Sequence, residues 1–181
     1  MKVDKSEIEG LYTLKIDVKK DIRGVFLKPY SLNELKEHHL IETVSEVFYS
    51  TSDLNVIRGM HFQVPPYAQQ KLVGVINGTI IEVVLDIRRG SKTFGKYCSF
   101  KLEANEGKFL FIPEGLAHGF LSLFKSTTVL YIVDKRFSSE HEGGIKYDSF
   151  GFSWPVESPI ISERDRNFVA MDKFITPFEL I

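Results

Sequence analysis

The sequence has a single cysteine, Cys98, among its 181 residues. One cysteine excludes an internal disulfide and is typical of proteins from a reducing compartment. An apolar run of about 20 residues is also missing, so no segment is expected to span a membrane. The first nine residues, Met1–Glu9, are charged and lack the apolar stretch of a secretory signal peptide. We therefore expect a cytoplasmic protein.

An excess of charge of either sign is missing too. The chain has 23 Lys and Arg against 24 Asp and Glu, which gives a formal net charge of −1. This balance predicts no basic face for nucleic acid, so an anionic ligand must be held by a few placed cations. The sequence also lacks linkers, low-complexity tracts and repeats. Residues 1–181 are therefore expected to form one domain with a full hydrophobic core.

Aromatic residues are abundant, with 15 Phe and 7 Tyr, and they favour pleated strands over helices. Short β-branched or aromatic runs predict strands at Val44–Tyr49, Val56–Val64, Lys71–Ile76, Thr79–Ile87, Phe109–Ile112 and Thr128–Val133. One short helix is expected at Ser31–His39, with Ser31 as its cap and Leu32, Leu35 and Leu40 on one side. So many strands in about 90 residues indicate an antiparallel sandwich or barrel.

The pair Asn77-Gly78 separates two apolar runs and predicts a two-residue hairpin. The hairpin register would place Lys71 and Glu82 on one face of a sheet as diagonal neighbours, within reach of each other. A cation and a carboxylate in such positions fit either a surface salt bridge or a pair that points into a partly polar barrel.

Gly107, Pro113, Gly115 and His118 follow the spacing G-x5-P-x-G-x2-H, which resembles the second motif of cupin barrels. In this motif a strand ends at the proline, the glycine permits a tight turn, and the histidine of the next strand points into the barrel. The first cupin motif carries a second histidine for a metal, but Gln63 stands where that ligand is expected. Because a metal site needs three or more suitable ligands, we expect no metal.

Longer motifs resemble the dTDP-4-dehydrorhamnose 3,5-epimerases. Residues 58–73 fit the run R-G-x-H-[FY]-Q-x-x-P-x-A-Q-x-K-L-V, Asp21–Phe26 fits D-x-R-G-x-F, and Ser162–Asp165 fits S-x-[KR]-D. The resemblance spans nearly the whole chain. It implies an all-β cupin (jelly-roll) barrel of antiparallel strands with one or two short helices. It also implies a homodimer that binds a nucleotide sugar and epimerises the carbons beside its ketone without a cofactor.

The resemblance assigns four catalytic positions. His61 would be the base, Asp165 would orient its ring, and Lys71 would stabilise the enolate oxygen. Tyr131 would be the acid that delivers a proton to the opposite face. Without the family, Tyr131 is better explained as a tyrosine of a core strand.

The resemblance also assigns a substrate-binding set. Arg58 and His118 would meet the phosphates and the sugar, Arg23 would meet a phosphate or the base, and Phe26 would stack on the base. Glu82, where the family more often has Asp, would hold the ammonium of Lys71. Three further positions complete the set: Lys28, Ser50 and Gln63.

Several departures from the family pattern lie near the expected nucleotide site. Lys28 replaces a glutamate, Glu46 and Phe48 replace a glutamine and an asparagine, and Arg136-Phe137 replaces two tyrosines. A donor in place of an acceptor suits guanine better than thymine, because guanine offers two acceptors on one edge. We therefore hypothesise that the nucleotide carrier of the sugar is GDP rather than dTDP. GDP-linked 4-keto-6-deoxy sugars, including heptoses, feed the synthesis of bacterial capsule and lipopolysaccharide.

Four alternatives remain open from the sequence. The first is inversion of carbon 3 alone, and the second is a 3,4-ketoisomerase, which the match at Tyr131 disfavours. A metal-dependent cupin is opposed by the missing second histidine. The fourth alternative is a cupin that only binds its ligand, and such a protein does not need the acid–base set His61, Lys71, Tyr131 and Asp165.

Overall fold

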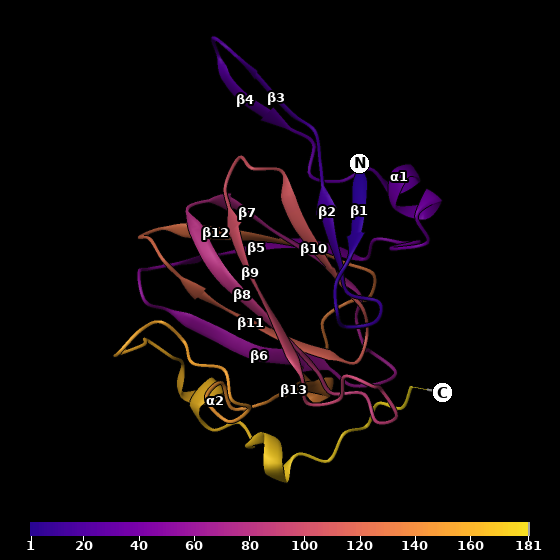
Figure 1. Cartoon of the computed structure of the whole chain (residues 1–181), viewed down its shortest axis with the longest axis vertical. Coiled ribbons are helices and arrows are strands. Elements are labelled where there is room, and N and C mark those ends of the chain that lie inside the picture. Colours follow the sequence, from indigo (N-terminus) through magenta and orange to yellow (C-terminus); the bar gives the residue numbers. More distant parts are fainter. Residues whose placement is uncertain (181) are drawn as a thin grey trace.

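The computed structural model describes residues 1–180 as two facing antiparallel sheets (Figure 1). The six-stranded sheet has the order β1 (Lys2–Lys5), β2 (Tyr12–Lys15), β10 (Lys108–Ile112), β7 (Lys71–Asn77), β12 (Thr127–Val133) and β5 (Glu46–Ser52). The five-stranded sheet has the order β13 (Glu142–Gly144), β6 (Ile57–Gln63), β11 (Leu116–Ser122), β8 (Thr79–Asp86) and β9 (Tyr97–Glu103). The predicted all-β barrel is confirmed.

Within residues 1–180, helical structure is limited to α1 (Leu32–Glu37), α2 (Glu163–Arg166) and the 3₁₀ turns η1 (Ser139–His141) and η2 (Met171–Lys173). The predicted helix forms, but it is shorter than Ser31–His39. Ser31 occupies the N-cap position, yet its side chain makes no capping hydrogen bond, so that detail was wrong. Leu35 and Leu40 are buried as expected. None of the helices in residues 1–180 has the length and apolar character needed to cross a membrane.

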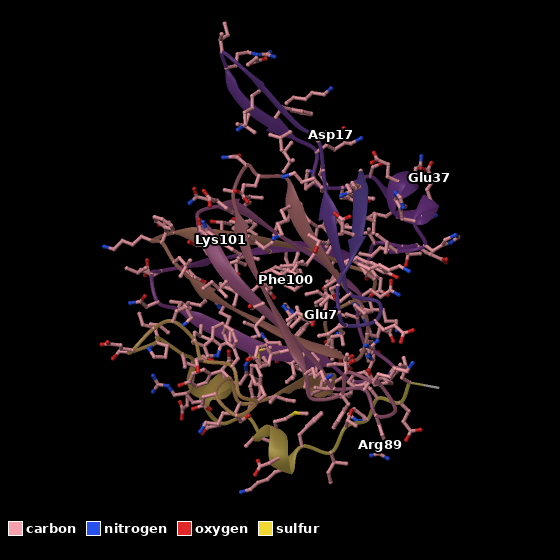
Figure 2. The ribbon with its side chains drawn as sticks, in the orientation of Figure 1. Glu7, Asp17, Glu37, Arg89, Phe100 and Lys101 are labelled. Carbon is pink, nitrogen blue, oxygen red and sulfur yellow. The ribbon has the colours of Figure 1, made fainter. Side chains whose placement is uncertain are left out.

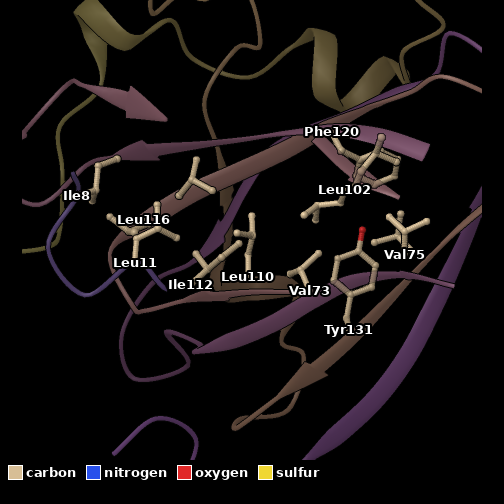
Figure 3. Packing of buried hydrophobic residues seen from close by; sticks show 13 residues of the cluster. Ile8, Leu11, Val73, Val75, Leu102, Leu110, Ile112, Leu116, Phe120 and Tyr131 are labelled. Carbon is tan, nitrogen blue, oxygen red and sulfur yellow. The ribbon is translucent and has the colours of Figure 1, made fainter. Parts of the chain in front are cut away.

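The space between the sheets is filled by apolar side chains (Figure 3). Val73 and Leu110 come from the six-stranded sheet, and Leu102 and Phe120 come from the five-stranded sheet. All four are at most 1% exposed. Burial of one such side chain stabilises a fold by about 1.5–3 kcal/mol, so this layer holds the two sheets together.

The prediction of a hairpin at Asn77-Gly78 was wrong. β7 pairs with β10 and β12, whereas β8 pairs with β11 and β9, so the turn carries the chain from one sheet to the other. Gly78 does adopt the positive φ of +82° that the turn requires. Both strands are buried along most of their length, and each is paired on both edges, β7 by β10 and β12 and β8 by β11 and the next strand, β9.

The six predicted strands all form, with ends that differ by at most three residues from those expected. Sequence reasoning gave no strand for β1, β2, β9 or β13, nor for β3 (Val18–Asp21) and β4 (Gly24–Leu27). β1, β2, β3 and β13 are four residues or shorter and rich in charged, polar or glycine residues, so their apolar periodicity is too weak to predict strands. β4 is a four-residue apolar run on an exposed hairpin. β9 does alternate, with Cys98, Phe100 and Leu102 on the side of the core, and this signal was missed.

β3 and β4 form a hairpin that projects from the barrel (Figure 1). Asp17 lies at its base, and α1 with Glu37 lies on the same side of the barrel (Figure 2). At the other end of the molecule, the segment after β13 runs along β6 and places α2 beside that strand (Figure 1). Backbone hydrogen bonds between Ile57 and Ile160 and between Met60 and Ile145 fix this segment.

β6 and β11 approach each other unusually closely at Gly59 and Gly119. A Cβ atom at Gly59 would lie 2.4 Å from the Cα atom of Gly119, and Gly59 has a φ of +138°. Backbone atoms fill this space, so no side-chain movement would relieve the clash. The close approach places the side chains of the neighbouring residues His61 and His118 at one end of the barrel.

We predict that Gly59→Ala lowers the free energy of unfolding by about 2–4 kcal/mol, because two strands must move apart. Gly24→Ala is the matched control. Gly24 also has a positive φ, +119°, but a Cβ atom there meets nothing within 4 Å. Chemical denaturation of both variants measures the difference. Equal losses in the two variants would show that backbone conformation alone, and not the close approach, sets the cost.

Candidate active site

A cavity of about 210 Å³ lies between the two sheets. The five-stranded sheet contributes four of the predicted site residues to the wall of this cavity: Arg58, His61, Gln63 and His118. The six-stranded sheet contributes three more: Ser50, Lys71 and Tyr131. Seven residues predicted from the sequence are thus brought to one cavity by strands β5, β6, β7, β11 and β12.

Asp165 lies behind His61, within hydrogen-bond distance of its ring. The hydroxyl of Ser162, the N-cap of α2, accepts a hydrogen bond from the backbone N–H of Asp165. The Asp165 carboxylate is 2% exposed, and its Oδ2 atom lies 3.0 Å from His61 Nε2 and accepts from the backbone N–H of Gly59 at 3.0 Å. Burial on its own would raise the pKa of Asp165. Hydrogen bonds from His61, Gly59 and Arg164 outweigh burial and hold this pKa well below its usual value.

The sequence-based pairing of Lys71 with Glu82 as sheet neighbours was wrong, because β7 and β8 belong to different sheets. The two side chains face each other across the barrel with His118 between them. Lys71 Nζ lies 3.0 Å from His118 Nε2, and His118 Nδ1 lies 2.7 Å from Glu82 Oε1. If Lys71 donates to Nε2, the proton of the neutral imidazole is on Nδ1 and is donated to Glu82.

Burial shifts the pKa of Lys71, His118 and Glu82 in the direction that favours the neutral form of each side chain. It lowers the pKa of Lys71 to about 8, although the charges of Glu82 and Glu142 act in the opposite direction. It raises the pKa of Glu82 well above its usual value, and Lys71 offsets part of that shift. Burial, together with the charge of Lys71, lowers the pKa of His118 well below its usual value. A neutral His118 therefore links a cation to an acid inside the barrel.

Tyr131 reaches the cavity from β12, and its hydroxyl points into the barrel toward the facing sheet (Figure 3). Its ring stacks on Phe48 of the adjacent strand, with centroids 4.9 Å apart and an interplanar angle of 16°. Burial and then the charge of Glu82 raise the pKa of Tyr131 above its ordinary value of 10. The phenol therefore keeps its proton at neutral pH.

Arg58 and Gln63 are partly engaged by the protein itself. Arg58 Nε donates to Ser52 Oγ at 2.9 Å, which leaves part of its exposed guanidinium directed outward. Gln63 donates to the carbonyl of Tyr67 at 2.9 Å and accepts from the backbone N–H of Ser138 at 2.6 Å. Gln63 therefore fixes the loop beyond β12 at the mouth of the cavity. Ser50 Oγ is buried without a hydrogen-bond partner among residues 1–180.

Arg23, Phe26 and Lys28 do not line this cavity. Arg23 and Phe26 lie on the projecting hairpin, where the Arg23 side chain is 86% exposed and Phe26 is 64% exposed. Phe26 and Lys28 line a separate space between the hairpin and α1, where Lys28 Nζ lies 3.8 Å from a carboxylate oxygen of Glu34. Within one chain, the predicted nucleotide-binding segment and the predicted catalytic residues are thus apart.

Sequence reasoning missed two charged residues of the site, Glu142 and Arg164. Arg164 donates to Glu142 Oε2 at 2.6 Å and lies 3.0 Å from His61 Nε2. Arg164 was present within the motif S-x-[KR]-D, but Glu142 had no motif to mark it. Within residues 1–180, no cluster of three His, Cys, Asp or Glu residues has the geometry to bind a metal ion.

Comparison with known proteins identifies the family to which this architecture belongs. The family model described as dTDP-4-dehydrorhamnose 3,5-epimerase matches residues 5–173. A dTDP-4-dehydrorhamnose 3,5-epimerase from Shigella flexneri is 37% identical over 182 residues, which cover 97% of this chain and 100% of that protein. The chain belongs to the dTDP-4-dehydrorhamnose 3,5-epimerase family. As a member of this family it is an isomerase that acts on a nucleotide sugar.

Two solved structures extend the likeness. The dTDP-4-dehydrorhamnose 3,5-epimerase of Bacillus anthracis, with TDP and pyrophosphate bound, is 34% identical with a TM-score of 0.90, covering 94% of this chain and 99% of that one. A 3′-monoepimerase from Streptomyces bikiniensis, in complex with dTDP-quinovose, is 25% identical with a TM-score of 0.88, covering 92% and 86%. Folds similar to that of this chain are thus named for inversion at one carbon and at two.

The hydrogen-bonded series Lys71–His118–Glu82 predicts the pH at which Lys71 loses its charge. Because the pKa of Lys71 is lowered to about 8, its ammonium is present below that pH and is lost as the pH rises through it. NMR of ¹³Cε-labelled lysine should show a Lys71 resonance with a midpoint near 8, below the ordinary lysine value of 10.5. Glu82→Gln removes a charge that favours the ammonium, so the midpoint should fall further. A Lys71 titration midpoint near 10.5 would contradict the burial of this ammonium beside His118 and Glu82.

Proposed function

We propose that this chain epimerises carbons 3 and 5 of a nucleoside-diphosphate-linked 4-keto-6-deoxy sugar, as one domain of residues 1–181 and without a cofactor. The observation that carries the proposal is that His61 and Tyr131 line one cavity from opposite sheets, with Lys71 on the same wall as Tyr131. A base and an acid on opposite sides of a bound sugar are what inversion at a carbon requires.

In the proposed reaction, His61 removes the proton from a carbon next to the ketone. The electron pair of the C–H bond moves to the oxygen at carbon 4, where the ammonium of Lys71 stabilises the enolate. A placed donor of this kind lowers a barrier by about 3–4 kcal/mol. The hydroxyl of Tyr131 then delivers a proton to the opposite face of that carbon, and the ketone re-forms. Asp165 stabilises the imidazolium that exists between these steps.

The substrate-binding roles follow from the position of each residue. Arg58 is exposed at the edge of the cavity and suits a phosphate, and His118 reaches the sugar from beside Lys71. Burial raises the pKa of the Tyr131 phenol, and the nearby Ser50 hydroxyl, which also lines the cavity, acts in the opposite direction. Glu82 acts through His118, because it does not line the cavity.

We take dTDP as the carrier, because the relatives described above are named for dTDP sugars or have TDP bound. GDP is the second candidate. Lys28 supports GDP, since it stands where the family has an acceptor for thymine. Glu34 supports dTDP, since it places a carboxylate 3.8 Å from the Lys28 ammonium and can supply the missing acceptor.

Proton exchange in D₂O is the experiment that tests this function. The protein is incubated with a 4-keto-6-deoxy sugar linked to dTDP or to GDP, and carbons 3 and 5 are followed by NMR. Deuterium should enter at both carbons with one carrier. His61→Asn should lower exchange at least about 10³-fold, and Tyr131→Phe should reduce inversion more than exchange, because the base still acts.

Three outcomes of this experiment would change the account. Exchange at carbon 3 alone would make the protein a 3-epimerase. Movement of the ketone to carbon 3 without inversion would make it a ketoisomerase. Failure of exchange with both carriers would reject the proposed epimerase.

We further propose that a homodimer in the cytoplasm is the working form. Arg23 and Phe26 are exposed on a hairpin that projects from the barrel, so they can serve a site only if the site belongs to a second copy (Figure 1). The exposed apolar residues Val47 and Tyr49 on the edge strand β5 add a surface suited to burial between copies.

Complementation tests the shared site. His61→Asn and Arg23→Ala should each reduce activity strongly when measured alone. After the two variants are mixed and allowed to exchange subunits, mixed dimers contain one intact site each, so about a quarter of wild-type activity should return if exchange is random. Recovery should fail when two His61→Asn preparations are mixed. Full activity of Arg23→Ala, or a monomer at assay concentration in sedimentation, would reject the shared site.

A further inference from the structure

Phe48 contacts the candidate acid, although the proposed reaction gives it no part. The register of β5 and β12 places Phe48 directly opposite Tyr131, and both side chains line the cavity between the sheets. Their rings are stacked, with centroids 4.9 Å apart and an interplanar angle of 16°. Stacked aromatic pairs on neighbouring strands stabilise each other beyond the burial of their surfaces, so each ring restrains the other.

Other neighbours of the Tyr131 ring are aliphatic or are not stacked on it. Val73 lies opposite Tyr131 on β7 (Figure 3), and Val129 belongs to the same buried cluster. His118 lies on the facing sheet, with its ring centroid 6.2 Å from that of Tyr131 and an interplanar angle of 59°. Phe48 therefore supplies a flat surface on which the phenol ring lies.

Phe48 also covers Tyr131 at the edge of the six-stranded sheet. β5 is the last strand of that sheet, and Phe48 is 43% exposed, whereas Tyr131 is 8% exposed. Position 48 is one of those at which the sequence departs from the family pattern, which has an asparagine there. The stack is therefore a feature of this chain and not of the pattern, and it lies beside the group that delivers the proton.

The position of the phenol decides whether a carbon of the sugar is inverted or only exchanges its hydrogen. Once His61 has removed the proton, the enolate can be protonated from either face. A proton from Tyr131 inverts the carbon, and the imidazolium of His61 can instead return a proton to the original face. In D₂O the proton on the imidazolium exchanges with solvent, so its return leaves deuterium in a sugar that is not inverted. A phenol held in line with the carbon therefore raises the share of inversion.

We propose that Phe48 is a positioning residue for the acid: its ring holds and covers the Tyr131 phenol, and this arrangement commits the enolate to inversion. This inference rests on the proposed function, because the enolate is that of the 4-keto sugar. Phe48 acts through Tyr131 and has no proton to give or take. Removal of its ring should therefore impair the delivery of the proton and leave proton abstraction by His61 intact.

Deuterium exchange and inversion, measured in one reaction, separate this role from a merely structural one. The protein is incubated in D₂O with the nucleotide-linked 4-keto-6-deoxy sugar that the wild type accepts, and deuterium in the sugar that is not inverted is compared with the inverted product. In Phe48→Leu the inversion rate should fall about tenfold, because the acid is displaced, while total exchange should fall less than about twofold. The ratio of exchange to inversion should rise accordingly.

Two variants serve as controls. Phe48→Tyr keeps an aromatic ring at this position and should keep the wild-type ratio of exchange to inversion. Phe124→Leu makes the same substitution at another exposed phenylalanine, which is 58% exposed, lies between β11 and β12 and does not line the cavity. It should also behave as wild type. Circular dichroism melting and sedimentation confirm that the variants are folded and have the wild-type mass.

A second measurement needs no nucleotide sugar. The rate at which the Tyr131 ring flips is measured by NMR of protein with ¹³C-labelled tyrosine rings, and Tyr131→Phe identifies the signals. The rate should rise at least about tenfold in Phe48→Leu, because a stacked ring in a close-packed site opposes rotation. In Phe48→Tyr it should stay at the wild-type value.

Two results would overturn the inference: an unchanged ratio of exchange to inversion in Phe48→Leu, or a ring-flip rate that this substitution does not change. The proposed function can fail separately. A wild-type protein that exchanges with neither nucleotide sugar would reject the epimerase, whereas faster ring flips in Phe48→Leu would still support the restraint of Tyr131 by Phe48.

Discussion

The carboxylate of Asp165 is the contact on which the arrangement of the site depends. It binds the ring of His61 and the backbone N–H of Gly59, and so joins α2 of the C-terminal segment to β6 of the barrel. Gly59 packs directly on Gly119, the residue after His118. Hydrogen bonds to a charged group contribute about 1.5–3 kcal/mol each, so the same contacts that fix the fold here also fix the base.

The barrel interior is organised so that each reactive group has a neighbour that determines its protonation. Lys71 and Glu82 are one cation and one acid that share a neutral His118, and the phenol of Tyr131 keeps its proton because it is buried. Lys71, Glu82, His118 and Tyr131 thus lie in a buried site, where Coulomb interactions are stronger than in solvent. His61, at the cavity mouth, is more accessible, with 21% of its side chain exposed.

Much of this could be predicted from the sequence, because the core strands carry strong apolar patterns and the site residues lie in motifs at fixed spacing. The wrong hairpin and the wrong pairing of Lys71 with Glu82 had a common cause, because both depend on which strands, distant in the sequence, pair with β7 and β8. Asn77-Gly78 has the local chemistry of a hairpin, but a turn between sheets uses the same positive φ, so local sequence does not distinguish them. For the same reason His118 was not expected between Lys71 and Glu82. Glu142 belongs to no motif and reaches the site only through the fold.

A crystal structure with an unreactive nucleotide sugar, such as dTDP-quinovose, would test the central claim most directly. The account predicts that the sugar lies in the cavity between the sheets, with His61 and the Tyr131 hydroxyl on opposite faces of the ring. The oxygen at carbon 4 should lie within hydrogen-bond distance of Lys71 Nζ. A sugar with His61 and Tyr131 on the same face, or one bound between the hairpin and α1 instead, would contradict inversion by these two residues.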